Sequence, residues 1–170
     1  MNKRICLNKS VLDFINSKLT PESRVLEFGG GWSSKWLAHR CGELIVIETS
    51  FKSANIIKNE SPGKCKILVP RVGLYYAKDL HKMLHGVTWA DLVLIDCVEV
   101  LRATATRFAW PLVKPGGWLV FDDAQRERHE STIAWLNEVG GEPVSLVWQL
   151  GDVEGAEERL ALVWQKNNSK

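Results

Sequence analysis

Five short apolar runs alternate along this chain with segments whose apolar residues recur at helical spacing. Unbroken apolar runs of this length are typical of strands that are buried on both faces, as they are in a parallel sheet. The alternation therefore predicts an α/β domain built on an open, mostly parallel sheet with helices on both faces. The runs read RVLEFG, ELIVIE, CKILV, ADLVLID and WLVFDD and occupy residues 24–29, 43–48, 65–69, 90–96 and 118–123.

The rest of the chain adds helices and a final pair of strands. Helical spacing and cap residues predict helices at 8–19, 33–41, 50–59, 73–84, 98–112 and 129–139, and a Pro-Gly pair predicts a tight turn at 113–117. Two further strand-like runs, at 142–150 and 158–166, are joined by a polar loop with no helix between them. They should pair antiparallel, which gives a sheet of seven strands.

Length and composition narrow the class of protein. A chain of 170 residues suffices for one domain with a real core but not for a nucleotide-binding domain plus a separate substrate domain. A formal charge of +2 does not indicate a nucleic-acid partner. There is no apolar stretch of signal or membrane-spanning length, so we expect a cytoplasmic protein with reduced thiols. The widely spaced cysteines are Cys6, Cys41, Cys65 and Cys97.

Three consecutive glycines, Gly29, Gly30 and Gly31, stand where the first strand meets the first helix of the sheet. In an open parallel sheet, this turn is usually the floor of a ligand site at the carboxyl ends of the strands. Glycines permit dihedrals that side chains forbid, and they let the backbone approach a ligand closely. Glu48 ends the next strand at about the 20-residue spacing of an acid that accepts ribose hydroxyls, so the pattern predicts an adenosine-like ligand.

Three features separate the candidate ligands of this turn. The third glycine of the G-x-G-x-x-G pattern would fall at Ser34, so a pyrophosphate site is not indicated. A dehydrogenase would also need a substrate domain that this length leaves no room for. Glu27 lies two residues before the first glycine, where a carboxylate suits a ligand that carries an ammonium group. An adenosine bearing an amino acid is therefore the expected ligand.

The segments around these residues resemble the class I S-adenosylmethionine-dependent methyltransferases. VLEFGGGWSSKWLA resembles their first motif, LIVIETS the acidic end of their second strand, and LVKPGGWLVFDDA their fifth-strand motif. More narrowly, EFGGGWSSKWLA, DLVLID, a downstream Arg102 and KPGGWLVFDDAQR resemble small bacterial methyltransferases that read E-x-G-x-G-x-S-T, D-G-x-x-R and P-G-G-x-x-x-x-D-(D/N)-x-x-R. The resemblance implies a Rossmann-like three-layer domain over residues 1–170, in which 1–22 form a lead-in helix and 23–170 the cofactor-binding core.

The same resemblance implies a cofactor, S-adenosyl-L-methionine (SAM), and roles for individual residues. Glu27 would orient the methionine end of the cofactor, Glu48 would take the ribose hydroxyls, and Asp96 would lie beside the sulfonium or the acceptor. Two positions depart from the family. No acid or amide in LVPRVG, after the third strand, can bind the adenine amine, and Cys97 replaces a common glycine. The expected cofactor-binding residues are Glu27, Gly29, Gly30, Gly31, Ser33, Glu48, Thr49 and Asp96.

Methyl transfer from a sulfonium needs few catalytic groups, because the methyl group is already activated. Asp96, Asp122 and Asp123 end two strands that would be neighbours in the sheet order of the family, so the resemblance implies that these three are the catalytic carboxylates. They could supply a base for an oxygen or nitrogen acceptor. They could also bind a magnesium-like divalent cation, as in metal-dependent small-molecule O-methyltransferases, although no metal ligand is assigned. The simpler role is that Asp122 or Asp123 caps the next helix.

Other polar and aromatic residues have a functional and a structural interpretation. Arg102, Arg126 and Arg128 could clamp an anionic acceptor, but solvated helix charges are the favoured interpretation. His129 could be a base, but a lone histidine at a helix start is expected at the surface. Trp32 either packs under the first helix of the sheet or covers the cofactor.

Three functions remain open from the sequence. The first is SAM-dependent methyl transfer to a small-molecule or sugar-like acceptor, with no membrane partner. The second is aminopropyl transfer, which is disfavoured because DCVEV lacks the acid and proline expected after Asp96. The third is a non-catalytic module that keeps the fold for partner binding. Few loops are available to recognise an acceptor, so a second subunit could contribute, which is compatible with a homo-oligomer.

Overall fold

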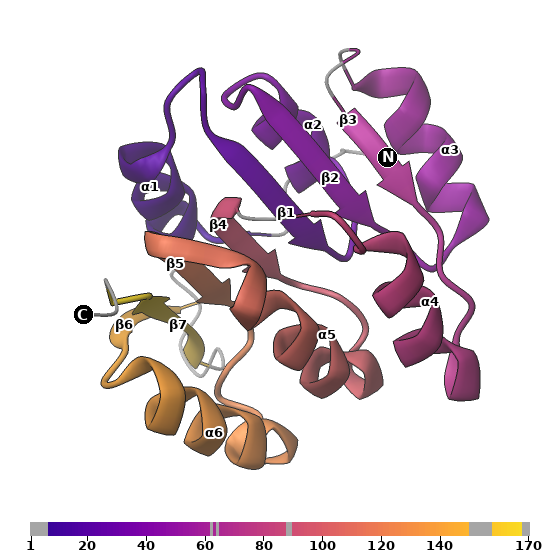
Figure 1. Cartoon of the computed structure of the whole chain (residues 1–170). Coiled ribbons are helices and arrows are strands. Elements are labelled where there is room, and N and C mark those ends of the chain that lie inside the picture. The colour runs from indigo at the N-terminus through magenta and orange to yellow at the C-terminus, as the bar shows by residue number, and fades with distance from the viewer. Residues whose placement is uncertain (1–6, 62, 64, 88–89, 150–157, 168–170) are drawn as a thin grey trace.

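The computed structural model describes residues 7–61, 63, 65–87, 90–149 and 158–167 (Figure 1). Cys6 and the loop predicted at 151–157 lie outside the described residues. Within the described part of the chain, no helix is both long and apolar enough to cross a bilayer. Cys41 and Cys97 are buried and in no disulfide, as expected, whereas Cys65 is only half-buried.

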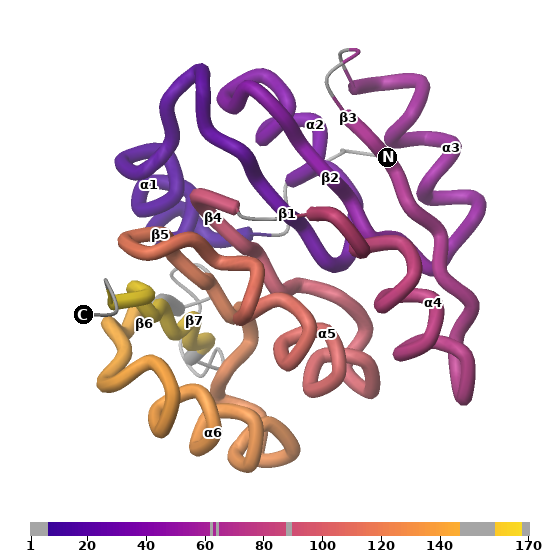
Figure 2. Tube along the Cα trace, viewed as in Figure 1, coloured from indigo at the N-terminus to yellow at the C-terminus, as the bar shows by residue number. Residues whose placement is uncertain are grey.

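The strands form one seven-stranded sheet in the order β3-β2-β1-β4-β5-β7-β6. β1 pairs in parallel with β2 on one side and with β4 on the other, although β4 comes much later in the chain (Figure 2). β7 runs antiparallel to both β5 and β6, which confirms the predicted terminal pair. The strands are β1 (Arg24–Phe28), β2 (Glu43–Ile47), β3 (Cys65–Leu68), β4 (Ala90–Ile95), β5 (Val113–Phe121), β6 (Val144–Gln149) and β7 (Glu158–Gln165).

Helices cover both faces of the sheet, so the predicted three-layer α/β architecture is confirmed (Figure 1). On one face Leu26 and Ile45 pack with Leu80 and Leu101, and on the other Val25 packs in a second cluster with helices from the N-terminal half. Alternate strand residues thus enter separate cores, as a buried parallel sheet requires. The helices are α1 (Lys9–Lys18), α2 (Trp32–Ala38), α3 (Phe51–Glu60), α4 (Tyr76–Met83), α5 (Glu99–Leu112) and α6 (Glu130–Gly140), with 3-10 turns at Gly73–Tyr75 and Glu127–His129.

The predicted element boundaries differ from the structure mainly at strand β5. The tight turn expected at 113–117 lies within β5, where the pairing with β4 shifts register between Ala90 and Leu92. Gly116 has a φ of +77° there, so the backbone bends as a turn would while the strand continues. The prediction of a separate turn was therefore wrong, because the bend is absorbed as an irregularity of a paired strand.

Strand order reverses between β1 and β4, which is the topological switch point of the sheet. β2 and β3 lie on one side of β1, and the chain then returns across the sheet to place β4 and β5 on the other. Crossover connections on opposite sides leave a crevice at the carboxyl ends of β1 and β4. The fold therefore directs any ligand to the loops that follow these two strands.

Candidate functional site

A cavity of ≈ 230 Å³ lies at the switch point, above the carboxyl ends of β1, β2 and β4. Seven of the eight expected cofactor-binding residues line it, and Glu27 does not. The structure also adds residues to the wall that sequence patterns did not single out as lining, namely Ile47, Cys97 and Val98. The expected residues in the lining are Gly29, Gly30, Gly31, Ser33, Glu48, Thr49 and Asp96.

The first two glycines of the loop are required by packing. Gly29 has a φ of +93°, and a Cβ added to it would lie 2.2 Å from the carbonyl oxygen of Asp96. At Gly30, a Cβ would lie 2.5 Å from the Ile57 side chain, whereas at Gly31 it would meet nothing within 4 Å. The loop thus lets the ends of β1 and β4 touch, and it leaves the third glycine facing open space.

Glu48 supports the glycine loop from the end of β2. Its Oε2 accepts a hydrogen bond from the Gly30 amide at 2.9 Å, and its Oε1 accepts one from the Ser50 amide at 2.6 Å. The residue is buried, yet it lines the cavity. Each carboxylate oxygen can accept a second hydrogen bond, so Glu48 can hold the loop and still bind two hydroxyls of a ligand.

Glu27 lies below the cavity rather than in its wall. Its side chain is fully buried, and its two oxygens accept hydrogen bonds from the hydroxyls of Ser33 and Ser34, both at 2.5 Å. Burial raises the pKa of Glu27 to about 8, against the lowering effect of the two serine hydrogen bonds, and the charges of Asp96 and Glu48 raise it further. Because Ser33 lines the cavity, any effect of Glu27 on a ligand passes through that hydroxyl.

The raised pKa of Glu27 predicts that stability falls as pH rises. The folded state keeps this proton up to about pH 8, whereas the unfolded chain releases it near pH 4.5. The stabilisation that comes from the protonated Glu27 is therefore complete below pH 4.5 and is lost as pH rises from 4.5 to about 8. We expect Glu27→Gln to remove this part of the decline, about 1 kcal/mol per pH unit. Urea unfolding at pH 5.5, 6.5 and 7.5 measures the difference in slope from wild type.

A matched control for this prediction is Glu22→Gln, which changes an exposed glutamate near the start of the same strand. Its stability curve should run parallel to that of wild type over the same pH values, because the other buried carboxylates contribute equally to both proteins. If Glu27→Gln also ran parallel to wild type, Glu27 would not be held protonated in the folded state.

Arg102 links the ends of β4 and β5 from within helix α5. Its guanidinium is buried and donates to the Cys97 carbonyl at 2.8 Å, to the Asp122 carbonyl, and to Asp96 Oδ1 at 3.1 Å. Its Nη2 also lies 3.7 Å from Asp123 Oδ2. The interpretation of Arg102 as a solvated helix charge was therefore wrong. A signal was available in the spacing, because Arg102 lies three and seven residues before Ala105 and Ala109, on the apolar face of the helix.

Of the three expected catalytic carboxylates, only Asp96 lines the cavity. Burial raises the pKa of Asp96 to about 7, and the charges of Asp122 and Asp123 raise it further, while Arg102 lowers it. A carboxyl group that titrates near neutral pH can accept a proton in a reaction. The structure thus brings one of the three to the cavity and places the other two behind it.

Asp122 and Asp123 support the site from the end of β5. Asp122 is buried, and burial together with the neighbouring charge of Asp123 raises its pKa. Asp123 has a φ of +55° and pairs with Arg126 at 2.9 Å and with Arg159 at 3.3 Å. Within the described residues, no group of three or more histidine, cysteine or acidic side chains is arranged to hold a metal ion.

His129 and two nearby arginines, Arg126 and Arg128, differ in burial. His129 is buried with its ring edge against Phe121, so the expectation that it lies at the surface was wrong. Burial lowers its pKa, and so does the charge of Arg102. Arg126 and Arg128 are surface side chains that pair with Glu99, both at 2.7 Å, which agrees with the favoured interpretation of these two.

Comparisons with known proteins give the context of this site. No family model matches the chain, and no curated protein matches its sequence significantly. Among solved structures, the chain is similar to the N-methyltransferase NodS from Bradyrhizobium japonicum, with 19% identity, 93% of each chain covered and a TM-score of 0.67. It is also similar to an O-methyltransferase from Bacillus cereus in complex with S-adenosylhomocysteine (SAH), with 16% identity, 98% of this chain and 84% of that chain covered, and a TM-score of 0.70. The chain has the class I SAM-dependent methyltransferase fold.

This methyltransferase fold is shared by proteins that act on different acceptors. An rRNA methylase from Streptococcus thermophilus also matches, with 10% identity, 96% of this chain and 100% of that chain covered, and a TM-score of 0.69. N-, O- and RNA methylases are thus similar to the chain to about the same degree. The likeness shows the fold and leaves the acceptor open.

Trp32 forms part of the cavity wall of this methyltransferase fold. It is the first residue of α2 and is half-buried, and it lines both the switch-point cavity and a second hollow of ≈ 230 Å³ between α2 and α3. The Lys35 amine lies 5.6 Å from the centre of its ring. Of the two roles expected for Trp32, the wall position agrees with contact to a ligand.

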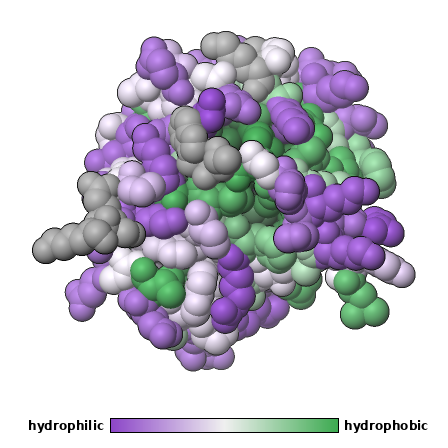
Figure 3. All heavy atoms as spheres, viewed as in Figure 1, coloured by the Kyte–Doolittle hydropathy of each residue, from purple (hydrophilic) through white to green (hydrophobic). Residues whose placement is uncertain are grey.

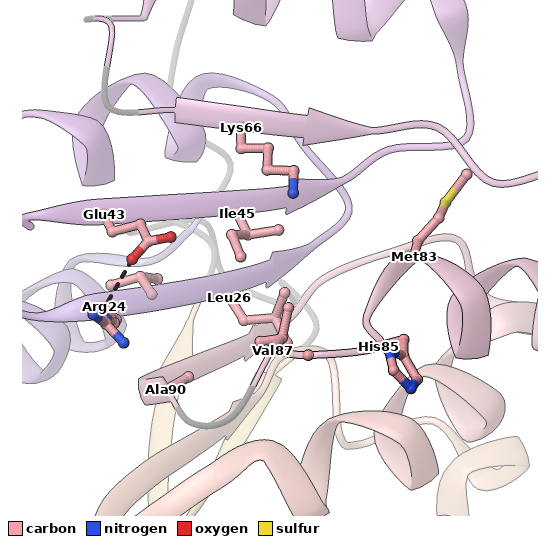
Figure 4. A pocket seen from close by; sticks show the side chains of 11 residues that line it. Arg24, Leu26, Glu43, Ile45, Lys66, Met83, His85, Val87 and Ala90 are labelled. Atoms are coloured by element: carbon pink, nitrogen blue, oxygen red, sulfur yellow. Dashed lines mark ion pairs between the residues drawn. The ribbon is translucent and has the colours of Figure 1, made fainter.

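A further cavity of ≈ 270 Å³ lies at the opposite edge of the sheet, by the first residues of the strands (Figure 4). Leu26 and Ile45 form its floor, and the Arg24–Glu43 ion pair lies at its rim with a separation of 3.1 Å. Apolar atoms gather over the middle of this face of the molecule (Figure 3). The cavity is larger than the one at the switch point, but ligands of this fold class bind at the carboxyl ends of the strands, so it is not the candidate site.

Proposed function

We propose that this protein transfers a methyl group from SAM to a small-molecule acceptor. One observation carries the proposal: the glycine loop, Glu48 and Asp96 converge on one cavity at the switch point of a methyltransferase fold. SAM needs a backbone that approaches it closely, a hydrogen-bond acceptor for its ribose hydroxyls and a carboxylate near its cationic end. The residues present fit each of these needs.

The proposed binding roles follow from the contacts of each residue. The loop from Gly29 to Gly31 lines the cavity, and Gly31 faces open space, so the ligand would pass along this backbone. Glu48, already held by two amides, would accept the two ribose hydroxyls with its remaining lone pairs. Ser33, whose hydroxyl donates to Glu27, would contact the methionine end, so that a cationic ligand draws negative charge onto Glu27.

The proposed chemistry requires only one residue of this chain to move a proton. When bound, SAM supplies a methyl group on a sulfonium, which is already a good electrophile. Asp96 would accept the proton of the acceptor, and Arg102 would hold the Asp96 carboxylate in place through its 3.1 Å hydrogen bond. The rest of the site would bring the two reacting atoms to near-attack distance, which is the larger part of the rate enhancement.

A small-molecule acceptor is supported by the charges around the cavity. The arginines near the ends of β3 and β5 are paired with carboxylates, namely Arg71 with Asp79 and Arg126 with Glu99 and Asp123. A nucleic-acid substrate requires cationic side chains that are available to phosphates. The net charge of +2 adds no support for such a substrate.

Isothermal titration calorimetry with SAM, SAH and NAD tests the cofactor. We expect SAM and SAH to bind and NAD not to bind. Glu48→Gln should weaken SAH binding about tenfold to a hundredfold, because a charge-assisted hydrogen bond to ribose becomes a weaker one. Glu43→Gln, at the exposed start of the same strand, is the control and should leave SAH affinity unchanged. Tight binding of NAD alone, or an unchanged affinity of Glu48→Gln, would contradict the assignment.

The same titrations separate the catalytic role of Asp96 from binding. Asp96→Asn should keep SAH affinity within a few-fold and lose turnover in any acceptor assay in which wild type is active. Wild-type SAH binding with no methylation across a broad acceptor screen would instead favour a non-catalytic module.

A further inference from the structure

Exposed apolar side chains are concentrated on three segments that each contribute a residue to the cavity wall, namely Thr49, Tyr76 and Val98. Among the described residues, six of the nine large apolar side chains that are exposed lie on segments that directly follow β2, β3 or β4. Single exposed apolar residues are ordinary, but a group at one edge of a sheet marks a binding surface. We call this group the apolar rim: Phe51, Val72, Leu74, Tyr75, Val98 and Val100.

The apolar rim is continuous with the wall of the cavity. Val98 belongs to both, because it lines the cavity and is still 57% exposed. Val100, two residues later in the first turn of α5, is 81% exposed, and Tyr75 immediately precedes Tyr76, which lines the wall. Asp96 lies two residues before Val98. A molecule seated on Val98 and Val100 would therefore reach the carboxylate that is proposed to act as the base.

The charged residues next to Tyr75, Val98 and Val100 form ion pairs within the protein. Glu99, which stands between the two valines, accepts hydrogen bonds from Arg126 and pairs with Arg128, both at 2.7 Å. Arg71 donates to Asp79 at 2.7 Å, and its guanidinium lies 4.4 Å from the centre of the Tyr75 ring. These pairs hold the charges next to Tyr75 and the two valines within the protein, so this part of the rim offers mainly apolar side chains to a ligand.

We propose that the apolar rim binds the body of a neutral, largely apolar acceptor, such as a substituted phenol, and directs its nucleophilic atom toward Asp96. This inference rests on the proposed function, and it selects an apolar acceptor over a sugar-like one. In the transfer, the acceptor oxygen bonds to the methyl carbon as the carbon–sulfur bond breaks. The electron pair of that bond goes to sulfur, and the hydroxyl proton passes to Asp96. The products are a methyl ether and SAH.

Two phenols that share the nucleophilic hydroxyl and differ in the para substituent test the inference: 4-butylphenol, whose substituent is apolar, and 4-hydroxyphenyl β-D-glucopyranoside, whose substituent is a sugar. Each is titrated into SAH-bound protein labelled with ¹³C at the methyl groups of valine and leucine. The butyl compound should bind at least tenfold more tightly than the glucoside. It should shift the methyl signals of Leu74, Val98 and Val100, whereas Val139 and Val144, which are exposed elsewhere, should not respond.

A pair of variants adds an independent measurement. Val100→Ser should weaken binding of 4-butylphenol about tenfold and leave SAH affinity unchanged, because Val100 does not line the cofactor cavity. Val144→Ser, the matched control, should change neither affinity.

The possible failures can be told apart. If SAH does not bind, the proposed function falls and the acceptor inference falls with it. If SAH binds but 4-butylphenol binds no more tightly than the glucoside, or does not shift the rim signals, only the inference is overturned. If analytical ultracentrifugation shows a dimer and the rim signals shift with protein concentration alone, a second copy of the chain occupies the rim, which also overturns it.

Discussion

Gly29→Ala is expected to destabilise the fold by about 3 kcal/mol and to lower SAH affinity at least a hundredfold. The new methyl group would lie 2.2 Å from the Asp96 carbonyl oxygen and 2.6 Å from Cys97 Cα, which are backbone atoms that cannot rotate away. The residue would also have to keep a φ of +93°, which costs an alanine further energy. The ends of β1 and β4 would separate, and the cavity between them would lose its shape.

Gly31→Ala is the matched control for stability, two residues along the same loop. A Cβ at Gly31 meets nothing within 4 Å, and the residue is exposed, so we expect its free energy of unfolding to stay within about 0.5 kcal/mol of wild type. Urea unfolding and SAH titration measure both variants. If Gly29→Ala were as stable as Gly31→Ala, the close approach of the two strand ends would not be a requirement of the fold.

Arg102→Met is the second change with a large expected effect, a loss of about 3–5 kcal/mol of stability. Methionine fills similar space but leaves the Asp96 carboxylate without its guanidinium partner, and removing one member of a buried ion pair costs this much. Arg102 lowers the pKa of Asp96, so its loss raises that pKa further above the value in the unfolded chain. The deficit should therefore grow as pH rises through about 7.

Arg126→Met is the control, because it removes an arginine that pairs with Asp123 and Glu99 at the surface, where its side chain is 40% exposed. It should cost less than about 1 kcal/mol. Adding Asp96→Asn to Arg102→Met should restore part of the lost stability, because no charged Asp96 then remains buried without a partner. Chemical unfolding at pH 6 and pH 8 measures all four proteins. An Arg102→Met deficit equal to that of Arg126→Met would contradict the role of Arg102 as a buried link.

Local patterns were sufficient to predict the architecture and the location of the site. The run ADLVLID contains β4, which ends one residue before the carboxylate of Asp96. The glycine triplet lies, as predicted, at the switch point beside Glu48. Both features depend on residues that are close together in sequence. An apolar run predicts a strand, and a glycine turn followed by an acidic residue at the end of the next strand predicts a ligand site. The bend at Gly116 was misassigned, since only the tertiary structure shows that β4 pairs with Val113 before the bend and with Trp118 after it.

Side-chain environments were less predictable because they depend on strand order. Glu27 and Glu48 look equivalent as carboxylates near strand ends, yet one is fully buried under two serines and the other lines the cavity. His129 was expected at the surface, but it ends a 3-10 turn that lies against β5, where it is buried beside Phe121. Burial of a polar group reflects what other elements place over it, and one segment does not contain that information.

Sequence alone therefore determined the α/β class, the strands and helices, and the loop where a ligand should lie, because each follows from short-range periodicity and from the special dihedrals of glycine. Tertiary structure decided which of the three aspartates reaches the cavity, that Arg102 is the buried cation among them, and that the exposed apolar residues gather at one edge. The physical reason is that parallel pairing of β1, β4 and β5 brings together chain ends that are far apart in sequence. Charge, burial and apolar surface at the site arise from that juxtaposition.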